Sequence, residues 1–225
     1  MNNALNDIRV VTKMNTNEIA RFASQAQSAA KDLSASTLSF VDASKIFFQQ
    51  GDSMAEAINK ATITMKAANI SFKSSVEDMS EYLTAIWNSY QVGADEMEHY
   101  VDIMAALGAN TATSMEEIST AMQKVAATAN NVGVSMEQMS SIIATSASVT
   151  RQSAETVGTA WNTMLSRLGG LKLGETLEDG VNLNKYSTAL KKVGVEVLDT
   201  QGNLRDMGTV LEELGGKWNT LSKAQ

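Results

Sequence analysis

Apolar residues recur at alternating steps of three and four positions through most of this chain. In residues 76–90 they are Val76, Met79, Leu83, Ile86 and Tyr90. This spacing places apolar side chains on one face of a helix, and it returns after Asp95, Ser114 and Ser153. The pattern therefore predicts a mainly α protein built from short amphipathic helices.

Polar residues mark where these helices begin. Residues 75–80, 114–119 and 135–140 read SVEDMS, SMEEIS and SMEQMS. In each stretch a serine stands three positions before a Glu, Gln or Asp, which is the spacing of a capping box. Glycines are expected to mark helix ends, and they stand at Gly93, Gly108, Gly133, Gly169 and Gly170.

The first-turn apolar residues of the middle region fall at nearly even intervals. They are Ile58, Met79, Met97, Ile118, Met139 and Val157. The interval predicts an array of about six short antiparallel helices over residues 51–168, because short loops make consecutive helices antiparallel neighbours. A true sequence repeat would give this spacing, but so would the ordinary lengths of helices and loops.

Residues 1–50 form a separate N-terminal helical segment in this interpretation. From Leu5 to Leu33 the steps between seam residues alternate between three and four, which is typical of a heptad repeat. We expect one long helix there and a second helix over residues 36–49. A possible coiled-coil seam for self-association comprises Leu5, Ile8, Asn15, Ile19 and Phe22. The alternative is that the long helix packs back onto the array.

Residues 169–225 are richer in glycine, leucine and charged residues. Residues 185–192 are expected to be helical, and the valines and leucine of 195–198 suit an extended strand. A turn over 199–203 and a return strand from Leu204 would complete a small β-hairpin. Residues 207–221 are then expected to form a last helix.

The composition narrows the function. The chain has no proline, which favours uninterrupted helices, and no cysteine, which rules out disulfides and thiolate metal sites. Its formal net charge of −7 disfavours a nucleic-acid surface and adhesion to anionic lipid. No segment has the length and hydrophobicity of a membrane span or a signal peptide.

Candidate chemistry is sparse. His99 is the single histidine, and the glutamate pairs at 116–117 and 212–213 point about 100° apart on a helix, so neither pair forms a two-carboxylate site. Residues 199–203 lack the full spacing of a calcium loop, and 167–176 lacks phosphate-loop spacing. We predict that this chain is not an enzyme and has no catalytic residue, cofactor site or metal site.

Four stretches together carry a family resemblance. They are VGVSMEQMSS at 132–141, ETVGTAWNTMLSRLGG at 155–170, KKVGVEVLDTQGNLRDM at 191–207 and LEELGGKWNTLSKAQ at 211–225. Their order resembles the core region of phage tail tape measure proteins, and the third stretch is the most specific. Trp161 and Asn162 depart from the small or basic residues typical of the second stretch. The positions that match the family pattern are Gly133, Ser135, Glu137, Gly158, Arg167, Gly194, Asp199, Gly202, Asn203 and Arg205.

The resemblance implies a structural virion protein that acts in tail assembly, tail-length determination and genome delivery. It implies as partners other copies of the chain and proteins of the tail tube and the distal tail or tail tip. The expected location is the tail lumen or tail tip, with the host cytoplasm as the site of assembly. We also expect a fragment of a longer chain. The alternative function is a free-standing helical-repeat adaptor that binds a protein partner.

Overall fold

A computed structural model of the chain describes residues 2–71, 74–169 and 184–222. Within these ranges the chain forms eleven α-helices, so the prediction of a mainly α protein is confirmed. The helices belong to two compact units, unit 1 (Met1–Ser119) and unit 2 (Thr120–Gln225). The three-part division at residues 50 and 168 stays a prediction, which limited proteolysis would test.

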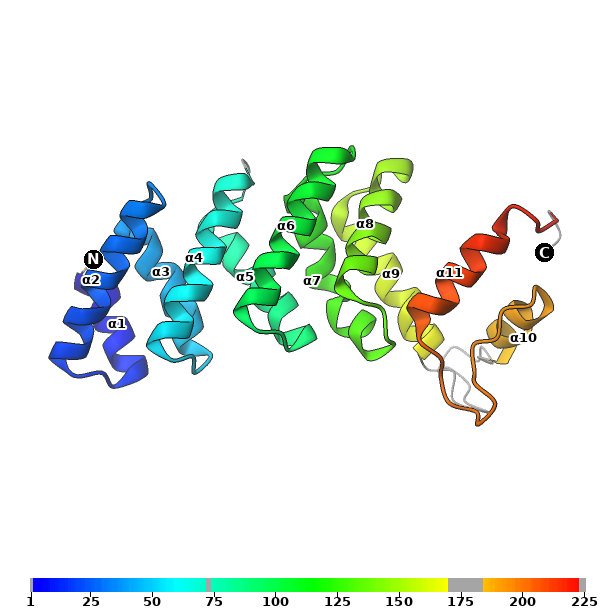
Figure 1. Ribbon diagram of the computed structural model, residues 1–225, viewed down its shortest axis with the longest axis horizontal. Helices are drawn as coiled ribbons and strands as arrows, with labels where there is room; N and C mark the ends of the chain where they lie inside the picture. Colours follow the sequence, from blue (N-terminus) through cyan, green and yellow to red (C-terminus); the bar gives the residue numbers. More distant parts are fainter. Residues whose placement is uncertain (1, 72–73, 170–183, 223–225) are drawn as a thin grey trace. The chain divides into compact units, whose positions relative to one another are not determined.

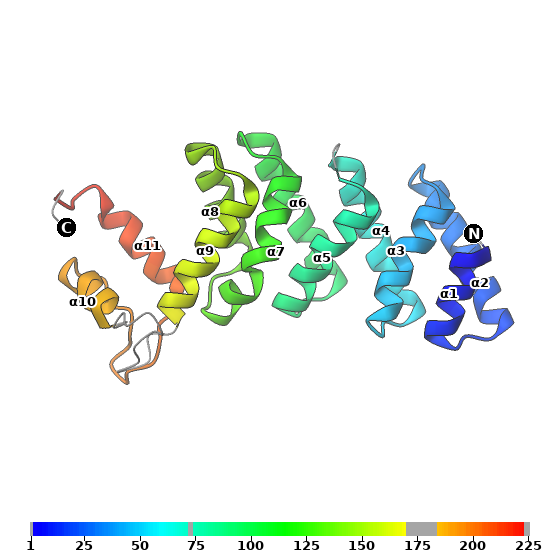
Figure 2. The same ribbon diagram turned by 180° about the vertical axis from the view of Figure 1, so that it is seen from behind.

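Unit 1 is built from two layers of helices. α2, α4 and α6 form one layer, and α1, α3 and α5 form the other (Figures 1 and 2). The helices are α1 (Asn2–Thr12), α2 (Thr16–Asp32), α3 (Thr37–Gln49), α4 (Met54–Ile70), α5 (Val76–Tyr90), α6 (Ala94–Asn110) and α7 (Met115–Asn131), the last of which continues into unit 2.

The predicted long N-terminal helix is wrong, because the chain breaks between α1 and α2. Lys13 adopts a left-handed conformation with φ of 57°. Asn15 then caps α2: its side-chain oxygen accepts from the backbone N–H of Glu18 at 3.0 Å, and its own N–H donates to the Glu18 carboxylate at 2.8 Å. This local capping box starts a new helix within the heptad pattern.

The serine capping boxes predicted from the repeated phrase are confirmed. The backbone N–H of Ser114 donates to the Glu117 carboxylate at 2.7 Å, and the Glu117 N–H donates to the Ser114 hydroxyl at 3.2 Å. Ser75 and Ser135 cap α5 and α8 in the same way. Ser53 adds a further box at α4 that the sequence interpretation did not include. Short-range side-chain chemistry therefore sets most of the helix starts.

Six helices, α4 to α9, cover the stretch in which the sequence predicts about six. In α5, α6, α7 and α8 the residue four positions after the helix cap is fully buried. These residues are Met79, Met97, Ile118 and Met139, respectively. In α4 this place belongs to Ala57, which is fully buried, whereas Ile58 is half-buried. The predicted alignment of first-turn residues is therefore one position too late in its first member.

The core of unit 1 is held by interlocking aromatic side chains. The rings of Phe22 and Phe48 meet edge to face with their centroids 5.2 Å apart, and those of Phe47 and Trp87 do so at 5.6 Å. Such edge-to-face contacts add to the free energy gained by burial. Phe47 and Trp87 come from α3 and α5, so their contact joins two helices of one layer.

A half-buried ion pair lies beside these rings. The Lys60 ammonium lies 2.8 and 2.9 Å from the two carboxylate oxygens of Asp52. It also lies 5.2 Å from the centroid of the Trp87 ring and 5.9 Å from that of Phe47. A cation in this position is attracted by the faces of the rings. The pair joins the loop before α4 to the aromatic contact.

Unit 2 contains the rest of α7, with α8 (Met136–Thr150), α9 (Ala154–Gly169), α10 (Asn184–Lys192) and α11 (Met207–Trp218). Here small residues let helices approach closely. A Cβ atom placed on Gly158 of α9 would lie 2.6 Å from the carbonyl oxygen of Ala121 on α7. Trp161 donates to the Ser146 hydroxyl at 3.0 Å, and Asn162 accepts from Thr128. The two departures from the family pattern thus join α9 to its neighbours.

The predicted β-hairpin near the C-terminus is wrong, since the described residues there contain one isolated antiparallel bridge, Leu198 to Leu204, and no strand. The turn itself forms, with φ of 83° at Gly202. The strands do not extend because both flanks are already engaged: the N–H of Val195 donates to the end of α10, and Asp206 caps α11. Gly170 and most of the stretch before α10 lie outside the described residues.

Candidate functional site

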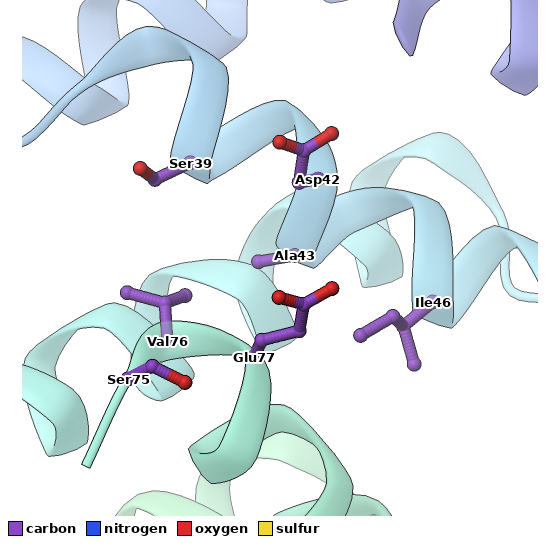
Figure 3. Close-up of a pocket in the computed structure, with 7 residues that line it drawn as sticks. All are labelled: Ser39, Asp42, Ala43, Ile46, Ser75, Val76 and Glu77. Atoms are coloured by element: carbon purple, nitrogen blue, oxygen red, sulfur yellow. The ribbon is translucent and has the colours of Figure 1, made fainter.

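Three surface hollows in the described parts of the two units have the shape of a binding site. The smallest lies between α3 and the start of α5 and has a volume of about 180 Å³ (Figure 3). It is lined by Ser39, Asp42, Ala43, Ile46, Ser75, Val76 and Glu77. The carboxylates of Asp42 and Glu77 come from opposite sides of this pocket, one from each helix.

The hydroxyl group of Ser75 in this pocket is already engaged in capping. It accepts from the Asp78 N–H at 3.0 Å and donates to the Asp78 carboxylate at 2.7 Å. The seven lining residues include no histidine or lysine, and the bases among them are the carboxylates of Asp42 and Glu77. The pocket therefore offers two carboxylates around a small apolar floor.

A wider groove of about 580 Å³ runs between α2 and α4 in unit 1. Its floor is apolar and its rim is polar; the lining residues are Arg21, Gln25, Ser28, Ala29, Asp32, Met54, Ala55 and Ile58. The rim carries one cationic and one anionic side chain, Arg21 and Asp32. The groove can accept apolar side chains. Because its rim carries one positive and one negative side chain, it does not favour a positively charged partner over a negatively charged one.

The third hollow, the α8/α11 groove, lies in unit 2 and has a volume of about 390 Å³. It is lined by Glu137, Gln138, Ser141, Ile142, Gly208, Leu211 and Glu212. The Gln138 amide donates to the Glu212 carboxylate at 2.8 Å, which joins the first turn of α8 to the middle of α11. Gly208 faces the Gln138 side chain so closely that a Cβ atom would collide with it.

The glycines that match the family pattern occupy backbone junctions. Gly133, Gly194 and Gly202 have φ of 82°, 77° and 83°, a left-handed region that favours glycine. Gly133 follows α7 and Gly194 follows α10, so both act as helix C-terminal caps. Gly158 serves the close approach of α9 to α7. These four positions therefore have structural roles, at different places in unit 2.

Two further matched positions lie at the start of α8. The Ser135 hydroxyl accepts from the Gln138 N–H at 3.2 Å, and the Ser135 N–H donates to the Gln138 side chain at 3.2 Å. Glu137 stands in the first turn, where a negative charge suits the helix dipole, and it also lines the α8/α11 groove. Arg167 lies in the last turn of α9, where a cation is favoured for the same reason.

The remaining matched positions build one turn and fix it to α11. Asp199 accepts from the backbone N–H of Gln201 at 2.9 Å and of Asn203 at 2.8 Å. These hydrogen bonds, that from Asn203 foremost, lower the pKa of the Asp199 carboxyl. Because the carboxylate is occupied by N–H donors, it acts here as a turn cap.

Arg205 forms the connection from this turn to α11. Its guanidinium donates to both carboxylate oxygens of Glu213, at 2.6 and 3.2 Å, and to the carbonyl of Glu196 at 2.6 Å. The hydrogen bonds from Arg205 lower the pKa of Glu213. A planar guanidinium suits this forked arrangement. The most specific part of the family pattern is thus a structural module.

The residues of the predicted self-association seam do not lie together on one exposed face. Ile8 and Phe22 are fully buried in unit 1, and Leu5 and Ile19 are half-buried. Asn15 is the exposed cap of α2. Because Ile8 and Phe22 are buried inside unit 1, they cannot contact a second copy of the chain while unit 1 keeps this fold.

The sequence interpretation missed one charge feature. Residues 74–119 contain nine Asp or Glu residues and no Lys or Arg. Some of the nine have local roles, as Asp78 and Glu117 do in capping boxes, and Glu98 pairs with Lys66 at 2.6 Å. Counting charge along windows of the chain would have found the feature.

A family model described as phage-related minor tail protein matches residues 23–225. The chain therefore belongs to the phage-related minor tail protein family, and it is a structural component of a phage tail. No solved structure matches the chain.

The family gives the coarse location and partners of the chain. As a tail protein it is part of the virion and interacts with other virion components. Structural tail proteins of this kind are typically non-enzymatic. Within the described residues there is no helix long and apolar enough to cross a membrane, and no group of three or more His, Asp or Glu residues is placed to hold a metal ion.

Proposed function

We propose that this chain is the helical core region of a tape measure protein and acts in tail assembly, tail-length determination and genome delivery. The observation that carries the proposal is the stretch at 191–207, whose resemblance to tape measure proteins is the most specific in the chain. Within this stretch Asp199 caps the turn, and Arg205 fixes the turn to α11 through its ion pair with Glu213. Membership of the minor tail family supports the same assignment.

The proposed partners are further copies of the chain and proteins of the tail tube and the distal tail or tail tip. The proposed location is the tail lumen or the tip, after assembly in the host cytoplasm. We propose no direct contact with the genome by this segment, because its net charge of −7 opposes binding to phosphates.

Graded in-frame deletions in the gene that encodes this chain test length determination. Electron microscopy would measure the tails of phage that carry deletions in helical regions. We expect tails shortened in proportion to the residues removed, by about 1.5 Å per residue where the ruler is a continuous helix. The matched control replaces the deleted helix with an unrelated helical sequence of equal length and should restore tail length.

Tails of unchanged length after a large helical deletion would contradict the ruler function. A tag on an exposed residue, located by immunogold labelling, tests the position. Label along the tail axis or at the distal end supports the proposed location, whereas label on the capsid contradicts it.

A helical adaptor for another protein is the second candidate, favoured by the apolar floor of the α2/α4 groove. The Ile58→Lys substitution would place a charge in that floor at a half-buried position. An adaptor function predicts assembled tails of normal length that lack a tail component. A tape measure function predicts altered or absent tails when the gene is shortened.

A further inference from the structure

Each helix of the α8/α11 groove carries an exposed apolar residue beyond the groove. Val149 lies seven residues after Ile142 on α8, and Trp218 lies seven residues after Leu211 on α11. Seven residues are about two helical turns, so each pair lies on one face of its helix. Val149 is 76% exposed and Trp218 is 65% exposed. Apolar side chains of this size are mostly buried in folded chains.

The backbone of α11 is accessible between these side chains. A Cβ atom placed on Gly215 would meet nothing within 4 Å. Gly215 lies four residues after Leu211 and therefore on the same side of the helix. A glycine at such a place permits the backbone of another segment to approach closely. This face of α11 thus leaves room for another segment to approach its backbone.

The charge of the groove restricts what it can receive. Glu137 and Glu212 stand at its rim, and the seven residues that line it include no Lys or Arg. A complementary segment would present apolar side chains flanked by positive charges.

The C-terminal end of α1 has this combination. Val10 is 80% exposed and Val11 is 40% exposed. Both valines lie between Arg9 and Lys13, whose side chains are also exposed. Two uncovered apolar residues with a cation on either side match the apolar residues Ile142 and Leu211 and the acidic rim of the α8/α11 groove.

We propose that the end of α1 in one copy of this chain docks into the α8/α11 groove of a second copy. The two surfaces are different parts of the molecule, so a dimer joined by one such contact keeps one free α1 and one free groove. Contacts of this kind do not close on themselves unless the geometry forms a ring. Copies would therefore associate head to tail. The proposal goes beyond the proposed function, and either can fail without the other.

Sedimentation equilibrium of the purified chain tests the association. The mean mass of the wild-type chain should rise with concentration past that of a dimer, and should fall as salt is added because the rim charges are screened. Val10→Asp should weaken association by on the order of tenfold or more, since it removes a buried apolar contact. Neutralising Arg9 or Lys13 should weaken it by about two- to fivefold each.

A mixing experiment tests whether the α1 end of one copy meets the groove of another. The first variant, Val10→Asp, keeps an intact groove. The second, Glu212→Lys with Trp218→Lys, keeps an intact α1 and alters only exposed positions. Each alone should be monomeric, and an equimolar mixture should form a one-to-one dimer that does not grow. This result requires contact between the α1 end of one copy and the groove of another, because the mixture retains one intact pair of these surfaces.

Leu38→Asp is the matched control, since Leu38 is an apolar residue of unit 1 that is 45% exposed and distant in sequence from Val10. It should leave association unchanged. Circular dichroism should show that all variants keep the helical content of the wild-type chain. A wild-type chain that is monomeric at every concentration, or a mixture that does not dimerise, would overturn the proposal.

Discussion

Units 1 and 2 pack short helices by two different means. The fully buried phenylalanines among the described residues, Phe22, Phe40 and Phe47, all belong to unit 1, whereas the large fully buried side chains of unit 2 are aliphatic: Met122, Met136, Met139, Ile143 and Leu165. In unit 2 the backbones of α9 and α7 also come close together, at Gly158 and Ala121. Unit 1 therefore has an aromatic core, whereas unit 2 combines an aliphatic core with this close approach.

The two units differ as much in charge. Residues 1–119 contain 8 basic and 15 acidic residues, whereas residues 120–225 contain ten of each. The whole net charge of the chain is thus carried by unit 1. The overall composition conceals this division between the two units.

The largest expected effect comes from removing an aromatic ring from unit 1. Phe47→Ala should lower the free energy of unfolding by about 3–5 kcal/mol, because it leaves a cavity beside Trp87. Guanidinium unfolding measures the loss, and hydrogen exchange should locate it in α3 and α5. Phe47→Leu is the control and should cost less. Equal stability of Phe47→Ala and the wild-type chain would show that volume does not hold unit 1.

In unit 2 the harmful change is the addition of a methyl group. Gly158→Ala should lower the free energy of unfolding by about 1–3 kcal/mol, since the new Cβ atom would press on the Ala121 carbonyl. The control is Gly215→Ala, which meets no atom within 4 Å. It should raise the free energy of unfolding by about 0.5–1 kcal/mol through helix propensity. Thermal unfolding of the two variants should shift in opposite directions.

The ion pairs of unit 1 allow a comparison of burial. Lys60→Gln leaves the Asp52 carboxylate without its partner at a site where both side chains are less than one-fifth exposed. We expect a loss of about 1–2 kcal/mol. Lys66→Gln removes a pair in which both side chains are nearly half exposed, and it should cost about 0–1 kcal/mol. A larger loss for Lys66→Gln in urea unfolding would contradict the role of burial.

The smallest effect concerns the pH dependence of stability. The pKa of Glu213 is lowered by Arg205 and that of Glu56 by Ser53. A lowered pKa stabilises the folded state above the carboxyl pKa of the unfolded chain, and this contribution is lost as pH falls through the folded pKa. The wild-type chain should therefore exceed Glu213→Gln in stability at neutral pH, and the difference should shrink with acidification. Urea midpoints at several pH values measure it; a difference that grows on acidification would contradict the assignment.

Much of the helical framework was predictable because its signals are local. Ser114 and Glu117 are three residues apart, and their capping bonds form within a single turn. At Asn15 two local signals disagreed. The heptad spacing predicted one continuous helix, but the capping box of Asn15 and Glu18 starts a new helix there. The α8/α11 groove was less predictable from the sequence. It joins Ile142 and Leu211, which are 69 positions apart in the chain.

The sequence by itself determined most of the helix starts and the turns at Gly133 and Gly202, because each depends on residues close together in the chain. It also determined the membership of a phage tail family, which rests on the order of several stretches along the chain. The tertiary structure decided which apolar faces are covered. It buried Ile8 and Phe22 inside unit 1 and left Val10 and Trp218 exposed. It also reduced the predicted hairpin to a single bridge, since α10 and α11 engage the backbone on both sides of the turn. Periodicity shows that a helix has an apolar face, but only packing shows whether that face is already occupied.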